Sequence, residues 1–116
     1  MSLPVEAMLL RIFVGEQAKS GHRPLYEVLV MKAREMHMAG ATVLRGPLGF
    51  GRSTRIHTAK ILRLSEDLPM VIEIVDTQER IDAFLPVLDP MMGSGLVTLE
   101  KVQVLQYGTT LNLPAV

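Results

Sequence analysis

The chain contains no cysteine and no tryptophan, and aromatic residues make up only 4% of it. Without cysteine there can be no disulfide framework, thiolate metal site or cysteine nucleophile. The scarcity of aromatic residues leaves Val, Ile, Leu and Met to build the core, and it argues against RNA binding through bases stacked on a sheet. A chain of 116 residues can bury one core of its own, so we expect a single domain over residues 1–116.

Long apolar runs are also missing. No stretch approaches the roughly 18 apolar residues that a membrane span needs, and the first residues lack the charged and apolar regions of a signal peptide. We therefore expect a cytoplasmic protein without membrane insertion. The 12 basic and 12 acidic residues cancel, so no overall charge favours nucleic acid as a partner.

The first half of the hydrophobic pattern predicts a strand followed by a helix. Residues 6–14 predict a central strand, because apolar residues occupy both of its faces. One face carries Met8, Leu10, Ile12 and Val14, and the other carries Leu9 and Phe13. A polar loop over residues 15–23 leads to a helix that we expect to begin at Pro24 and to end at Gly40.

The middle of the chain predicts more β structure. Short strands over residues 41–44 and 60–64 are expected to form an antiparallel pair, with residues 46–58 as a long connecting loop. Residues 70–75 form a further β-rich run. This region supplies the β structure that lies between the two helices along the chain.

A second helix and a last strand complete the pattern. Asp76 and Glu79 have capping-box spacing at the expected helix start, and Pro86 should kink or shorten the helix. Its apolar positions are Ile81, Phe84, Leu85 and Leu88. Residues 97–107 predict the last strand, and residues 108–116 form a tail without a clear pattern.

The resulting order is strand, helix, strand, strand, helix, strand. This order predicts an α+β, ferredoxin-like βαββαβ fold, with an antiparallel sheet and two helices on one face. Because the first and last strands of the chain are apolar on both faces, the second face of the sheet would expose an apolar patch in a monomer. We expect copies of the chain to bury it by assembling.

The segment over residues 45–58 is the clearest candidate for chemistry. Three glycines within six positions, Gly46, Gly49 and Gly51, allow close approach of the backbone to a ligand, and successive N–H groups can bind an anion. Arginines in the segment offer forked donors that suit phosphate or carboxylate. A solvated hairpin loop remains an equally good interpretation of these residues alone.

A family resemblance strengthens the first interpretation. Gly49, Phe50, Gly51 and Arg52, followed by His57, resemble the base of the T-loop in PII nitrogen-regulatory signalling proteins. More extensively, the sequence from roughly residue 9 to residue 107 resembles a PII-like family catalogued as a domain of unknown function.

The resemblance implies a regulatory protein and not an enzyme. It implies a homotrimer with a small anionic effector, such as the adenine nucleotide AMP, in clefts between subunits. A T-loop-like loop over residues 46–58 would signal to a protein partner such as a transporter, channel or enzyme. No cofactor would be required.

The resemblance also assigns residues to the site. It places Thr42 near the nucleoside, and the glycines of residues 93–95 from a neighbouring subunit near the phosphates. Together with the basic loop, it gives this expected ligand-binding set: Thr42, Arg45, Gly46, Gly49, Gly51, Arg52, Ser53, Arg55, His57, Gly93, Ser94 and Gly95.

The sequence departs from the PII pattern in its charges. The phosphate-facing lysine of PII has no counterpart near Gly95, and Val104 and Gln106 stand where PII has two arginines. A triphosphate clamp would be incomplete, which favours a monophosphate, a cyclic nucleotide or another small anion over ATP.

Two alternatives remain from the sequence. One is a small enzyme that acts on a phosphorylated substrate in the same cleft. The other is a metal-responsive ferredoxin-like trimer, although His22, His37 and His57 lack the spacing of paired metal ligands. We expect neither catalytic residues nor a metal site.

Overall fold

The computed structural model describes residues 6–47, 49 and 67–111. Its elements alternate strands with helices and include two very short hairpins. In chain order they are β1 (Glu6–Gly15), β2 (Lys19–Ser20), β3 (Arg23–Pro24), α1 (Leu25–Glu35), β4 (Thr42–Arg45), β5 (Pro69–Asp76), α2 (Gln78–Leu88), the 3₁₀ helix η2 (Asp89–Met91), β6 (Leu96–Gln103), β7 (Gln106–Tyr107) and β8 (Thr110–Leu111).

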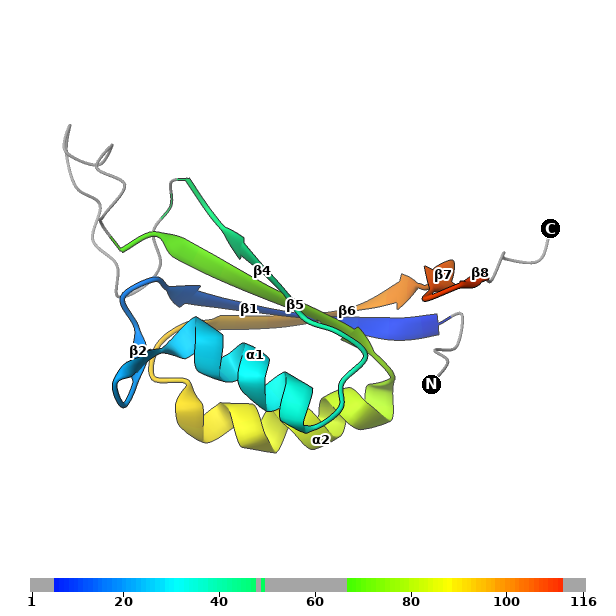
Figure 1. The fold of residues 1–116 in the computed structure, drawn as a ribbon, viewed down its shortest axis with the longest axis horizontal. Coiled ribbons are helices and arrows are strands. Elements are labelled where there is room, and N and C mark those ends of the chain that lie inside the picture. The colour runs from blue at the N-terminus through cyan, green and yellow to red at the C-terminus, as the bar shows by residue number, and fades with distance from the viewer. Residues whose placement is uncertain (1–5, 48, 50–66, 112–116) are drawn as a thin grey trace.

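A four-stranded sheet in the order β4-β5-β1-β6 forms the centre of the fold, and each adjacent pair of strands is antiparallel. Both helices pack on the same face of this sheet (Figure 1). The arrangement confirms the expected α+β, ferredoxin-like fold. In the described part of the chain, no helix has the length and apolar character needed to cross a membrane.

The core lies between the sheet and the helices. The alternation in β1 sends every second side chain toward the helices, and the equivalent residues of β5 do the same. The fully buried side chains of this core include Leu10, Ile12, Ile72, Ile74, Leu29, Ile81 and Phe84. The intervening residues of β1 and β5 point to the opposite face, which the helices leave uncovered (Figure 1).

Helix α1 is shorter than predicted. Pro24 is not its first residue but its N-cap, with an extended ψ of 134°. The helix ends at Glu35 and not at Gly40, because His37 takes a left-handed φ of 57°. The N–H of His37 donates to the Arg34 carbonyl and that of Met38 to the Ala33 carbonyl, each at 3.0 Å, so the turn satisfies the last carbonyls of the helix. Residues 38–41 are thereby released into a connecting segment.

Helix α2 begins one residue later than the predicted capping box. Thr77, and not Asp76, is the N-cap, and its hydroxyl accepts from the Arg80 N–H at 3.2 Å. Pro86 lies inside the helix, which continues to Leu88 and then into η2. Proline has no N–H and so leaves one carbonyl of the preceding turn without its helical partner, but the chain stays α-helical through Leu88.

Three predicted segments also differ in detail. β4 pairs with β5, with Val43 opposite Ile72, whereas the predicted partner over residues 60–64 lies outside the described residues. The predicted loop over residues 15–23 contains the β2–β3 hairpin. The last strand ends at Gln103, and a β7–β8 hairpin with Gly108 at φ 64° takes up the end of the predicted strand and the start of the predicted tail.

Candidate functional site

A hollow of about 680 Å³ lies on the sheet face that the helices leave uncovered. Its floor is formed by the outward residues of the two central strands, Leu9 and Arg11 of β1 and Glu73 and Val75 of β5. One wall is residues 39–42, which lead into β4. The opposite wall is residues 102–107, at and beyond the end of β6.

Arg11 is the central polar group of the floor. Its Nε lies 2.8 Å from Glu73 Oε2, and its Nη1 lies 2.6 Å from Glu100 Oε1. The hydrogen bond to Glu73, together with the negative charges of Glu100 and Glu73, raises the pKa of Arg11 above its ordinary value. The guanidinium is therefore a fixed cation that two carboxylates hold in place while it remains 38% exposed.

The chemistry of the hollow is mixed. In its described lining the charged residues are Arg11 and Glu73, whose charges cancel, while Thr42 and Gln103 add neutral polar groups. Leu9, Val75, Val102, Ala39 and Ala41 supply apolar surface. Such a lining suits a flat heterocycle with a few hydrogen-bonding groups better than an isolated phosphate, because no net positive charge offsets an anion.

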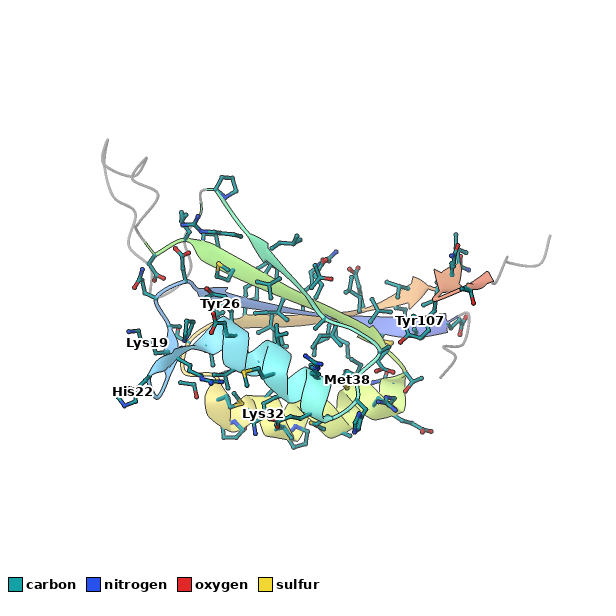
Figure 2. The ribbon with its side chains drawn as sticks, in the orientation of Figure 1. Lys19, His22, Tyr26, Lys32, Met38 and Tyr107 are labelled. Atoms are coloured by element: carbon teal, nitrogen blue, oxygen red, sulfur yellow. The ribbon has the colours of Figure 1, made fainter. Side chains whose placement is uncertain are left out.

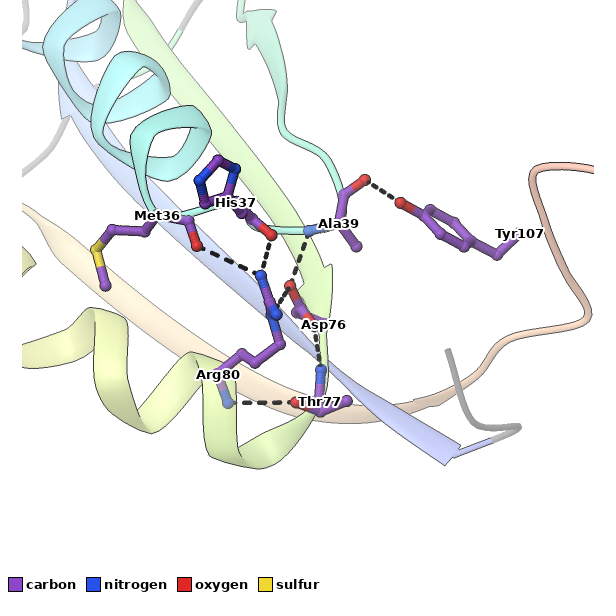
Figure 3. A network of polar contacts seen from close by, with 7 residues as sticks. All are labelled: Met36, His37, Ala39, Asp76, Thr77, Arg80 and Tyr107. Atoms are coloured by element: carbon purple, nitrogen blue, oxygen red, sulfur yellow. Dashed lines mark hydrogen bonds and ion pairs between the residues drawn. The ribbon is translucent and has the colours of Figure 1, made fainter. Parts of the chain in front are cut away.

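The wall over residues 39–42 is held from behind by a buried carboxylate. Asp76 is fully buried, and its Oδ2 accepts from the Ala39 N–H at 2.8 Å and lies 3.2 Å from Arg80 Nε. Arg80 in turn donates to the main-chain carbonyls of Met36 and His37 (Figure 3). The start of α2 thus fixes the connecting segment that brings Thr42 to the hollow.

The opposite wall carries Tyr107. Its ring packs in a second apolar cluster around the buried Ala7 and Val104. Its hydroxyl donates to the Ala39 carbonyl at 2.7 Å (Figure 3). The two walls therefore meet through this hydrogen bond and through the packing of Ala39 and Tyr107 in the same apolar cluster.

The structure separates the predicted site residues into groups. Thr42 lines the hollow. Arg45 is at the other end of β4, where its Nε lies 2.9 Å from Glu16 Oε2. Nearby, the Gly46 N–H donates to the Pro69 carbonyl at 2.8 Å, and Gly49 lies close against the ring of Pro69. These three residues form the described base of the predicted loop and do not line the hollow.

The remaining predicted residues lie either outside the described lining of the hollow or outside the described part of the chain. Gly93, Ser94 and Gly95 are exposed between η2 and β6. Their predicted contact with a neighbouring subunit stays a prediction. Five further predicted residues lie outside the described part of the chain: Gly51, Arg52, Ser53, Arg55 and His57.

Sequence reasoning missed the floor and the supports of the hollow. Arg11 and Glu73 are charged residues at outward positions in the middle of two mostly apolar strands. A charged residue in such a strand was the feature of the sequence that could have indicated a polar site. The ion pair between them could not be predicted from the sequence, because it joins residues 62 positions apart. Tyr107 gave no signal beyond its place in the last strand-like run.

A family model and a curated relative each match most of the chain. The family model DUF190, described as "Uncharacterized ACR, COG1993", matches residues 7–104. A UPF0166 protein from Aquifex aeolicus (strain VF5) is 39% identical over 103 residues, which cover 87% of this chain and 95% of the relative.

Two solved structures are similar in fold at low sequence identity. CPII from Thiomonas intermedia K12, a nitrogen regulatory PII-like protein bound to ADP, AMP and bicarbonate, has a TM-score of 0.61 and 19% identity, over 85% of this chain and 88% of that one. A protein from Thermus thermophilus, described as PII-like and signaling, has a TM-score of 0.60 and 18% identity, over 86% and 90% of the two chains.

Proposed function

Because the chain belongs to the DUF190 family, with PII-like proteins as its structural neighbours, we propose that it is a cytoplasmic PII-like regulatory protein. It binds an adenine nucleotide such as AMP at clefts between the subunits of a homotrimer. The hollow beside Arg11, Glu73 and Thr42 is the observation that carries this proposal.

The nucleoside is the part of the ligand that suits the hollow. Leu9 and Val75 offer an apolar floor for a base, and Thr42 and Glu73 offer polar groups at its edge. A pocket that is mostly apolar with a few polar groups is typical of small-molecule sites. The named ligands of CPII, ADP and AMP, support an adenine nucleotide as the first candidate.

The phosphate needs groups from outside this lining, since the charges of Arg11 and Glu73 cancel. The arginines of the loop over residues 46–58 and the glycines of residues 93–95 from a neighbouring subunit are the proposed source. Because few cations are available in these segments, a monophosphate is a better match than ATP.

The uncovered sheet face supports assembly. One row across all four strands is apolar, from Leu44 through Val71 and Phe13 to Leu96. Leu44 is 50% exposed and Leu96 is 56% exposed. Burying this row against two further copies removes an apolar surface from water and brings a neighbour's residues near each hollow.

The proposed role is regulation and not catalysis. Binding of the nucleotide shifts the loop over residues 46–58 between states, and a transporter, channel or enzyme recognises one of them. A ligand can shift this equilibrium only by its difference in affinity for the two states.

Isothermal titration with AMP, ADP, ATP and cyclic AMP tests the proposal. We expect AMP to bind more tightly than ATP, and Glu73→Gln to weaken AMP binding roughly tenfold, since a charged acceptor in the hollow is lost. The matched control is Glu79→Gln, which changes an exposed residue of α2 and should leave affinity unchanged.

Two results would contradict the proposal. Absence of binding by every nucleotide to a folded trimer would remove the nucleotide assignment. Chromatographic detection of converted nucleotide after incubation would instead favour the enzyme alternative.

A further inference from the structure

The main chain of Ala39 is held at both its N–H and its carbonyl by side chains from distant parts of the chain. Its N–H donates to Asp76 Oδ2 at 2.8 Å, and its carbonyl accepts from the Tyr107 hydroxyl at 2.7 Å. Asp76 ends β5, while Tyr107 lies in the β7–β8 hairpin. One short segment of the hollow's wall is therefore fixed by two independent supports.

The two supports differ in strength. Asp76 is fully buried and is itself held by Arg80, so that side is built into the folded core. The main-chain pairing of the β7–β8 hairpin is internal and separate from the four-stranded sheet. The Tyr107 hydroxyl fastens this separate hairpin to the opposite wall of the hollow.

We propose that Tyr107 is a positioning residue that ties the C-terminal wall of the hollow to residues 39–42 and so sets the hollow's width. The ring of Tyr107 packs with Ala7 and Val104, and its hydroxyl forms the hydrogen bond that ties the two walls together. A ligand that contacts both walls is then linked to the state of the C-terminal hairpin. This last step rests on the proposed function, whereas the tie itself does not.

The test compares Tyr107→Phe with Tyr26→Phe. The first variant keeps the ring and removes the hydroxyl that joins the walls. Tyr26 is the other tyrosine in the chain, and it lies on α1 far from Tyr107 along the long axis of the molecule (Figure 2). Both changes remove one hydroxyl, so any general effect of the substitution is matched.

Hydrogen exchange of single amides, followed by NMR without ligand, measures the tie. In Tyr107→Phe we expect the paired amides of the β7–β8 hairpin to exchange roughly two- to tenfold faster, because the hairpin loses its hydrogen bond to the Ala39 carbonyl, whereas the Ala39 amide keeps its bond to Asp76. Amides in the middle of α2 should keep their rates, and Tyr26→Phe should change neither set. Equal exchange of the hairpin amides in wild type and Tyr107→Phe would overturn the tie.

Ligand affinity and tyrosine fluorescence test the link to binding. Tyr107→Phe should bind AMP two- to tenfold more weakly, and Tyr26→Phe should bind it normally. Because the chain has no tryptophan, Tyr26→Phe leaves Tyr107 as the source of intrinsic fluorescence, which saturating AMP should change. Suppose that wild type binds AMP, that Tyr107→Phe binds it equally well, and that AMP does not change the fluorescence of Tyr26→Phe. The proposed link is then wrong, and the proposed function stands. If wild type binds no nucleotide, the function fails while the exchange rates still decide the tie.

Discussion

At the scale of single residues, Asp76 connects three parts of the molecule. Its carboxylate is fully buried and accepts from the N–H groups of Ala39 and Thr77, each at 2.8 Å. Arg80, one helical turn along α2, supplies the opposite charge. A buried carboxylate is tolerated only when such donors surround it, so the geometry of the wall depends on all of them together.

Replacing Asp76 by Asn should destabilise the fold. The amide keeps the size of the side chain but offers one acceptor oxygen in place of two, and it leaves Arg80 without its ion pair. We expect the free energy of unfolding in urea to fall by about 1–3 kcal/mol.

Asp82→Asn is the matched control for this change. Asp82 is exposed on α2 and its carboxylate accepts from Gln78, so its stability should stay within about 0.5 kcal/mol of wild type. Equal stability of the two variants would mean that the contacts of Asp76 contribute little.

The same residue shows where sequence reasoning stopped. Asp76 and Thr77 are both favourable N-caps, and the pattern alone selected the first. The alternative use of Asp76 depends on Ala39, 37 positions away, which no local pattern reveals. The buried positions of β1 and β5 were predictable because strand periodicity is local, whereas the floor of the hollow required knowledge of strand register.

At the scale of elements, the turn before β6 is constrained by close packing. A Cβ on Gly95 would lie 2.6 Å from the Phe13 carbonyl oxygen of β1, and the same atom on Gly93 would have nothing within 4 Å. Only one of these two glycines is therefore required by the packing of the folded chain itself.

Substituting Ala separately at Gly95 and at Gly93 tests this packing argument. Gly95→Ala should lower the free energy of unfolding by about 1–3 kcal/mol, because a main-chain oxygen cannot move aside without shifting β1. Gly93→Ala should be nearly as stable as wild type. Circular dichroism during thermal unfolding measures both, and an unchanged melting temperature for Gly95→Ala would contradict the packing argument.

Helix boundaries were harder to predict than helices themselves. Gly40 is the stronger stop signal in the sequence, yet α1 ends at Glu35 because His37 adopts the left-handed conformation. Histidine enters this region more readily than most residues, but nothing local required it to do so. Because α1 ends early, residues 39–42 are free to form a wall of the hollow.

At the scale of the whole molecule, the sheet has one face covered by helices and one left open (Figure 1). The open face combines the apolar row from Leu44 to Leu96 with the polar pair Arg11 and Glu73. An apolar row beside a polar hollow is consistent with subunits that meet along the row and bind ligand next to it.

A charge placed in the apolar row should dissociate the proposed trimer. Leu96→Glu introduces a carboxylate that would be buried in the interface, which costs several kcal/mol per subunit. Light scattering should report a monomer for this variant and a trimer for wild type.

Met31→Glu is the control for that experiment. Met31 is 42% exposed but lies on α1, away from the open face, so its substitution should leave the assembly intact. A trimer of Leu96→Glu as stable as the wild-type trimer would show that the subunits use another surface.

The position of β4 has a mechanical consequence. This four-residue strand begins at the hollow with Thr42 and ends at Arg45, which is paired with Glu16 beside the base of the loop. Three residue steps of a strand span about 10 Å. In the described sheet β4 is an edge strand bonded only to β5. Because Val43 in its middle packs against the hydrophobic core, the strand links the hollow to the loop base as one short element, and a displacement of Thr42 would reach Arg45 without unfolding of the chain.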